Sequence, residues 1–386
     1  MGNIIDYVNE FGEYSFLDKP FEAVDSLVLA VLSYLKYDDF LDEFGIVKRK
    51  VTLNQLIYKR ETYKKETDKL FVGLIDVPSY RVLLLAVANS KRFGKTELRY
   101  YVNQLDEVKE SQFAALVFFL ENEIPYIAFR GTDETLIGWK EDFNMAFLSP
   151  VPAQEKALKY LRRVTRRIGG QFYVGGHSKG GNLAVFASAM IKAKTQERIR
   201  TIYSLEGPGF KEAIFKDDNF LRITKKIVKI IPKSSIIGML LEHQDNYKVI
   251  KSSKNGLLQH DPFTWIVEKD DFQYLDDIDR KAMIMNQALY QWIQGMEDQE
   301  RMELVNTVFD ILASLEMESV LEMADDWKPM MKKIMEAAKE LDEETQKFLR
   351  KTIGQLLRMG TKSLIDAGEE RSKNIGRKFE KVLKKN

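Results

Sequence analysis

Residues 171–188 read QFYVGGHSKGGNLAVFAS, where an apolar run ends in two glycines and a helix-like apolar pattern begins after two more. A single serine, Ser178, lies between the glycine pairs and completes the pattern G-x-S-x-G. This order of strand, tight turn and helix is typical of a nucleophile elbow, in which the serine hydroxyl projects above the edge of a sheet. Because a helix begins beside Ser178, we expect the backbone N–H of Lys179 to point toward developing negative charge.

The same short pattern also occurs in ordinary glycine-rich turns and in phosphate-binding loops. The stretch lacks the G-K-[ST] sequence of a P-loop, and its helix continues with small residues that permit tight packing. We therefore interpret Ser178 as a nucleophile.

Apolar segments on both sides of this stretch predict a mixed α/β fold. Runs rich in Tyr, Phe, Val and Ile predict strands, and apolar residues at helical spacing predict helices. The predicted strands are 97–105, 113–121, 125–131, 171–176, 198–207, 225–232 and an outer strand at 247–253, and the predicted helices are 24–35, 152–168 and 182–191. Helices that alternate with apolar strands indicate a sheet covered on both faces.

The composition changes near residue 275. Only five of the 22 glycines and none of the three histidines lie beyond it. We therefore predict an α/β domain over 1–275 and a helical extension over 276–386. The basic end of the chain, residues 371–386, is interpreted as a solvated helix, with a helical cap or a peripheral contact with a membrane as the alternatives.

Bulk composition excludes several classes of function. The 59 basic residues balance the 58 acidic ones, so charge gives no argument for nucleic acid. The absence of cysteine excludes disulfides and thiol nucleophiles. Three scattered histidines form no metal motif, and no dinucleotide fingerprint is present, so we expect neither metal nor cofactor. The first residues do not resemble a signal peptide, and no apolar run reaches the ~20 residues of a spanning helix, which favours a cytoplasmic protein.

Two longer strings carry a family resemblance. Residues 126–147, YIAFRGTDETLIGWKEDFNMAF, together with GHSKGGNLA at 176–184 resemble the class 3 lipases in spacing and chain order. With GPGF at 207–210 and QHDPFTW at 259–265, the chain is most similar to the bacterial Mbeg-like lipase-related proteins. The resemblance covers roughly residues 1–275 and implies an α/β-hydrolase fold with a mostly parallel sheet covered by helices. It also implies a second oxyanion donor at Thr132, with Trp139 and Asp142 bracing that loop.

A serine nucleophile needs a base, and the chain offers three histidines. Side chains of neighbouring residues diverge at such a turn, so His177 is expected to be structural. His243 resembles a lipase histidine outside the triad. His260, in a late loop before Pro262, is assigned as the base by elimination and by resemblance, in the chain order serine, acid, histidine.

The acid is less clearly marked, because the stretch 222–234, where the class 3 lipases carry an Asp before a Pro, contains lysines and no carboxylate. Glu206, which follows a predicted strand as some lipase acids do, is our preferred replacement, and Asp245 is the alternative. The sequence thus predicts a serine hydrolase acting on a small-molecule or lipid ester. The missing Asp keeps open the alternative of a catalytically inactive binding module. The sequence does not indicate an oligomeric state.

Overall fold

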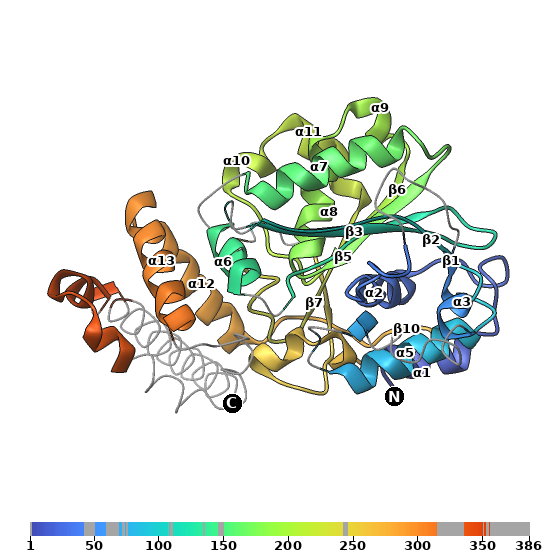
Figure 1. Cartoon of the computed structure of the whole chain (residues 1–386), viewed down its shortest axis with the longest axis horizontal. Coiled ribbons are helices and arrows are strands. Elements are labelled where there is room, and N and C mark those ends of the chain that lie inside the picture. The colour runs from blue at the N-terminus through green and yellow to red at the C-terminus, as the bar shows by residue number, and fades with distance from the viewer. Residues whose placement is uncertain are drawn as a thin grey trace, which may run out of the picture.

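The computed structural model describes residues 2–41, 51–58, 69–71, 74, 76–106, 108, 111–133, 136–145, 150–241, 246–314, 336–349, 351–352 and 355 (Figure 1). Asp245, the alternative acid, lies outside the described residues, as do His243, the side chain of Trp139 and the basic segment 371–386.

A nine-stranded sheet in the order β1-β2-β3-β4-β5-β6-β7-β8-β11 forms the centre of the molecule. Its middle, from β4 to β8, is parallel, and antiparallel strands complete both edges. The strands are β1 (Val51–Thr52), β2 (Glu97–Asp106), β3 (Ser111–Phe119), β4 (Tyr126–Phe129), β5 (Phe172–His177), β6 (Ile199–Leu205), β7 (Ile227–Pro232), β8 (Lys248–Ile250) and β11 (Tyr274–Leu275). β9 (Val267–Glu268) and β10 (Asp271–Phe272) form a separate hairpin. All seven strands predicted from the sequence are present.

Helices cover both faces of this sheet (Figure 1). One face carries α7 (Pro152–Thr165), α8 (Lys179–Met190), α9 (Ala193–Gln196), α10 (Glu212–Phe215) and α11 (Asp218–Ile223), and the other carries α1 (Ile4–Phe11), α2 (Ala23–Leu32), α3 (Leu53–Tyr58) and α5 (Val77–Asn89). The arrangement is that of an α/β-hydrolase, as predicted.

The period-two geometry of the strands explains why two cores form. In β3, Leu116 and Phe118 join the apolar cluster beneath α1, α2 and α5, whereas Ala115 and Val117 join the cluster beneath α7 and α8. Successive side chains point to opposite faces of a sheet, so a strand buried on both sides must be apolar throughout. This requirement accounts for the unbroken run in FAALVFF.

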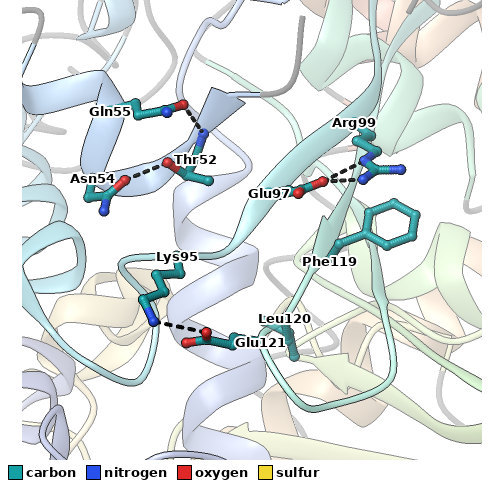
Figure 2. Close-up of a pocket in the computed structure, with 9 residues that line it drawn as sticks. All are labelled: Thr52, Asn54, Gln55, Lys95, Glu97, Arg99, Phe119, Leu120 and Glu121. Atoms are coloured by element: carbon teal, nitrogen blue, oxygen red, sulfur yellow. Dashed lines mark hydrogen bonds and ion pairs between the residues drawn. The ribbon is translucent and has the colours of Figure 1, made fainter.

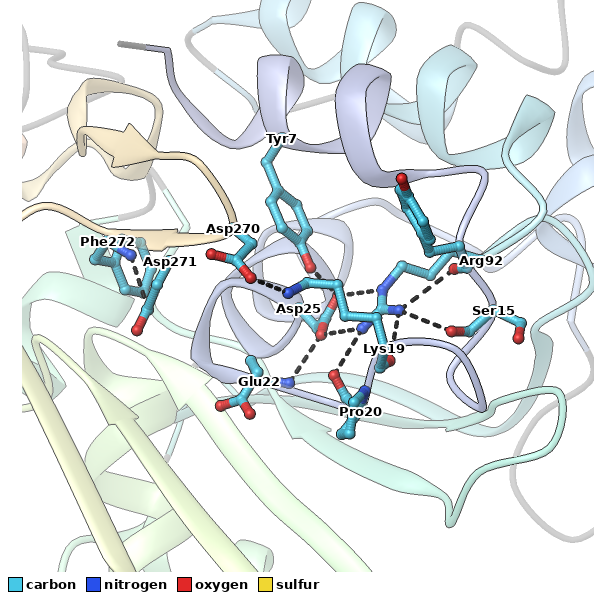
Figure 3. A network of polar contacts seen from close by, with 11 residues as sticks. Tyr7, Ser15, Lys19, Pro20, Glu22, Asp25, Arg92, Asp270, Asp271 and Phe272 are labelled. Atoms are coloured by element: carbon cyan, nitrogen blue, oxygen red, sulfur yellow. Dashed lines mark hydrogen bonds and ion pairs between the residues drawn. The ribbon is translucent and has the colours of Figure 1, made fainter.

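A buried ion pair anchors α2 beneath the sheet (Figure 3). The guanidinium of Arg92 donates to both carboxylate oxygens of Asp25 at 2.7 and 2.6 Å, and the Tyr7 hydroxyl donates to the same carboxylate at 2.9 Å. Arg92 also donates to the carbonyls of Lys19 and Pro20. The network therefore holds α2, through Asp25, and the segment just before it, through Lys19 and Pro20, against the body of the protein.

The described residues after Leu275 form helices and no strand. They include α12 (Arg280–Gln294), α13 (Asp298–Ser314) and the 3₁₀ turn η5 (Ala338–Glu340), and residues 343–349 are also helical. Phe309 of α13 packs against Phe143, with ring centroids 5.6 Å apart, and Asn286 of α12 donates to the Ser235 carbonyl at 2.8 Å. The predicted boundary at residue 275 stays a prediction.

Among the described helices, none combines the length and the apolar character needed to cross a membrane.

Candidate active site

Ser178 occupies a strained turn between β5, which ends at His177, and α8, which begins at Lys179. Its backbone has φ 56° and ψ −132°, a conformation that costs a residue with a side chain roughly 1–3 kcal/mol. The turn is held by Ser178 N–H donating to the Leu205 carbonyl and by Gly181 N–H donating to the Ser178 carbonyl, both at 2.9 Å. Strain retained at a single serine between a strand and a helix is the geometry that the sequence predicts.

The glycines beside Ser178 are required by a close approach of β4. A Cβ atom on Gly176 would lie 2.3 Å from the Phe129 carbonyl oxygen, and one on Gly180 would lie 2.1 Å from the same atom. Neither distance is possible without moving backbone. The absence of side chains therefore lets the end of β4, and with it the loop carrying Thr132, lie against the serine turn.

α6 (Leu136–Asn144) braces the loop that carries Thr132. The Thr132 hydroxyl donates to Asp142 Oδ2 at 2.6 Å, which is the contact that the family resemblance implies for Asp142. Burial raises the pKa of Asp142 to about 6, although the charge of Lys179 and the bond from Thr132 act in the opposite direction.

The side chain of Lys179 has a role that the sequence analysis missed. Its ammonium is buried, 3.1 Å from Glu141 Oε2 and 3.7 Å from Asp142 Oδ1. Glu141 is also buried and accepts backbone N–H bonds from Gln112 at 3.1 Å and Ala153 at 2.9 Å. This ion pair ties the first residue of α8 to α6, β3 and the start of α7. The only sign of this ion pair in the sequence is the opposite charge of residues 141 and 179. No local pattern indicates that the two side chains meet.

The structure brings together Glu206 and His260, the predicted acid and base. His260 Nδ1 lies 3.1 Å from Glu206 Oε2, although the ring N–H is not aligned for a regular hydrogen bond. Glu206 follows β6 with φ 53°, and its other oxygen accepts from the Ser235 hydroxyl at 2.9 Å. The carboxylate is thus held by β6 and by the loop after β7.

Electrostatics at His260 favour its charged form. Burial lowers the pKa of His260, but the charge of Glu206, assisted by Asp142 and Asp261, outweighs burial and raises the pKa above its usual value. The ring is partly accessible, with 21% of its side chain exposed. Within the described residues, Ser178 makes no hydrogen bond with His260. Nε2 is the ring nitrogen that would serve it, because Nδ1 faces Glu206.

His177 is buried, but its ring packs against the base instead of leaving the site. The His177 and His260 ring centroids are 4.7 Å apart, and the Tyr34 hydroxyl lies 3.2 Å from His177 Nδ1. Burial lowers the pKa of His177 well below its usual value, the nearby His260 ring adds to this, and the His260 backbone carbonyl acts in the opposite direction. His177 is therefore a neutral neighbour of the predicted base.

Comparison with known proteins now identifies the family. A family model described as Mbeg1-like matches residues 87–310. The chain belongs to the Mbeg1-like family. The matched region contains Thr132, Ser178, Glu206 and His260, and it extends past residue 275 through α12 into α13.

Two solved structures are similar to this Mbeg1-like chain at low identity. The crystal structure of M37 lipase is 17% identical, covers 55% of this chain and 68% of its own, and gives a TM-score of 0.33. A mutant form of MDLA from Penicillium cyclopium is 14% identical, covers 65% of this chain and 83% of its own, and gives a TM-score of 0.38. No curated protein matches the chain.

A cavity of about 600 Å³ lies away from this site, between β1, α3, β2 and β3 (Figure 2). Its charged side chains pair with one another: Lys95 with Glu121 at 2.9 Å, and Arg99 with Glu97. None of the predicted site residues lines it. This cavity is therefore separate from the candidate active site.

Proposed function

We propose that this Mbeg1-like protein is a serine hydrolase that cleaves carboxylic ester bonds. The observation that carries the proposal is the 3.1 Å contact between His260 Nδ1 and Glu206 Oε2, since a buried carboxylate beside one ring nitrogen leaves the other to act as a base. The strained position of Ser178 at the start of α8 supports its role as the nucleophile.

In the proposed reaction, Ser178 Oγ attacks the ester carbonyl while His260 Nε2 accepts the hydroxyl proton. Glu206 orients the ring and stabilises the imidazolium that forms. His260 then gives the proton to the departing alcohol, which leaves an acyl group on Ser178. A water molecule, activated by the same histidine, releases the acid and restores the serine.

The oxyanion would be held by the backbone N–H groups of Lys179 and Thr132. Lys179 N–H is the first amide of α8, where a helix provides no acceptor of its own. The positive end of the helix dipole adds a favourable field at the same point. Two preorganised donors of this kind typically provide about 2.7–4 kcal/mol each to the stabilisation of the transition state.

We propose a lipid or other acyl ester as the substrate class, because FRGT at 129–132 and GHSKGG at 176–181 resemble the motifs of the class 3 lipases.

The decisive experiment compares Ser178→Ala with Ser188→Ala, a buried serine further along the same helix. Each purified variant is assayed with a short p-nitrophenyl ester and with a fluorophosphonate probe, which labels only an activated serine. We expect Ser178→Ala to lose both turnover and labelling while Ser188→Ala keeps them. Turnover retained by Ser178→Ala, with an unchanged circular dichroism spectrum, would remove the nucleophile assignment. A wild-type protein that neither labels nor turns over would favour the binding-module alternative.

A further inference from the structure

Three buried polar atoms at the proposed base make no hydrogen bond of regular geometry. They are His177 Nε2, Glu206 Oε2 and His260 Nδ1. Each of these three residues places one atom that could bind a metal within 4.8 Å of the corresponding atoms of the other two. His177 is only 3% exposed and Glu206 only 1% exposed. Buried polar atoms are nearly always satisfied by a partner, a water molecule or an ion. Glu206 Oε2 and His260 Nδ1 face each other at 3.1 Å without a regular hydrogen bond, and His177 adds a third potential ligand, so the three residues could hold a cation in common.

The chemistry of the three atoms selects a metal ion of the zinc class. Two imidazole nitrogens and one carboxylate oxygen are a common protein ligand set for Zn²⁺, with a fourth position for water. Ligand atoms of a tetrahedral zinc site lie roughly 3.3 Å apart. Glu206 and His260 are already at 3.1 Å, so only His177 must approach, by at most about 1.5 Å.

The surrounding residues orient the ligand atoms toward the same point. The Tyr34 hydroxyl lies 3.2 Å from His177 Nδ1, and when Nδ1–H donates to it, Nε2 carries the lone pair. The Ser235 hydroxyl occupies Glu206 Oε1 at 2.9 Å, which leaves Oε2 for a metal. Such outer partners are a regular feature of metal sites.

We propose that His177 Nε2, Glu206 Oε2 and His260 Nδ1 form a zinc-binding site that reversibly inhibits the hydrolase. A metal at Nδ1 displaces any proton from that nitrogen to solvent, and the proton that the His260 ring keeps is then on Nε2. The nitrogen that would accept the Ser178 proton is then already protonated, and Glu206 is engaged by the metal. The inhibition rests on the proposed function, whereas the binding of the metal does not. Sequence alone did not suggest this site because its ligands are scattered along the chain.

The test uses the full chain after treatment with a chelator, titrated with ZnCl₂ by calorimetry and, in parallel, during ester hydrolysis. We expect one Zn²⁺ per chain and loss of turnover that a chelator restores, with no effect of Mg²⁺. Ser178→Ala should bind Zn²⁺ like the wild type, so metal binding is measurable even if the chain has no esterase activity. His177→Gln should weaken binding and raise the inhibitory Zn²⁺ concentration by at least about 10-fold.

Tyr34→Phe provides a second variant in case His177→Gln does not fold, and it should weaken binding by about 10-fold through the lost partner of His177. Bound cobalt(II) should give the visible absorption of a tetrahedral site in the wild type and lose it in His177→Gln. Absence of stoichiometric binding to the wild type, or equal affinity and inhibition in wild type, His177→Gln and Tyr34→Phe, would overturn the proposal. Binding by wild type and Ser178→Ala without any hydrolysis would leave the metal site standing and remove only the esterase.

Discussion

Replacing Lys179 with methionine should destabilise the protein more than any change to its exposed ion pairs. The substitution leaves Glu141, only 1% exposed, without its cation at 3.1 Å and with the charge of Asp142 nearby. Removal of one partner from a buried pair costs about 3–5 kcal/mol. Glu141 keeps two backbone N–H bonds, from Gln112 and Ala153, so we expect the lower end, about 3 kcal/mol. For a chain of 386 residues that corresponds to a fall in Tm of roughly 4–5 °C.

A double variant separates the unpaired charge from lost packing. Lys179→Met combined with Glu141→Gln removes both charges, and we expect it to recover about 1–2 kcal/mol of the loss. Recovery is partial because a glutamine amide has one acceptor oxygen where Glu141 uses two. Lys216→Met is the control, since its pair with Glu212 is exposed and should contribute less than about 0.5 kcal/mol.

The measurement is urea unfolding followed by circular dichroism, with esterase assays well below the lowest Tm. Sequence analysis alone predicts a mild effect of the Lys179 side chain, because only its backbone N–H has a role there. A Lys179→Met protein that unfolds within about 0.5 kcal/mol of wild type, like the control Lys216→Met, would refute the reasoning from burial.

Three further outcomes follow from the same geometry. Glu206→Gln should lower kcat by roughly 10²–10⁴-fold while leaving activity above that of Ser178→Ala, and a near-neutral result in steady-state kinetics would remove Glu206 as the acid. Gly131→Val should lower the rate by about 10²-fold or more, because its Cβ would lie 2.0 Å from the Tyr34 hydroxyl and 2.7 Å from the His177 carbonyl; wild-type turnover would show that the loop adjusts. Asp142 has a pKa raised from 3.8 to about 6, so the stability it contributes is present below pH 4 and lost as pH rises through 6. Between pH 4 and 7, the free energy of unfolding of the wild type should therefore fall by about 3 kcal/mol relative to that of Asp142→Asn, as measured by urea unfolding at each pH. If the two proteins show the same dependence of unfolding free energy on pH, the shifted pKa is contradicted.

The sequence determined those features that depend on neighbours along the chain. Unbroken apolar runs such as FAALVFF can be satisfied only by strands buried on both faces, and they form β3 and its neighbours as predicted. The glycines around Ser178 permit a tight turn because they carry no Cβ. The order of strand, serine turn and helix could therefore be predicted from this stretch of sequence alone. The Mbeg1-like family membership was also carried by contiguous motifs, and the family match confirms it.

Which distant side chains meet depends on the order of the strands and the packing of the helices in the folded chain. Glu206 reaches His260 because β6 pairs with β7, where Glu206 N–H donates to the Ile230 carbonyl at 2.8 Å and the chain then turns toward the histidine loop. No local pattern fixes the direction of a carboxylate after a strand.

The contacts of Lys179 with Glu141 and of His177 with His260 have the same origin. Each joins residues on different elements, and strand order and helix packing set the distance between them. The sequence shows the charge and the chemical type of each side chain, and therefore what each residue can bind. The fold determines whether two such side chains are close enough to interact. Ion pairs and metal coordination depend on distances of a few ångströms in space and not on separation along the chain.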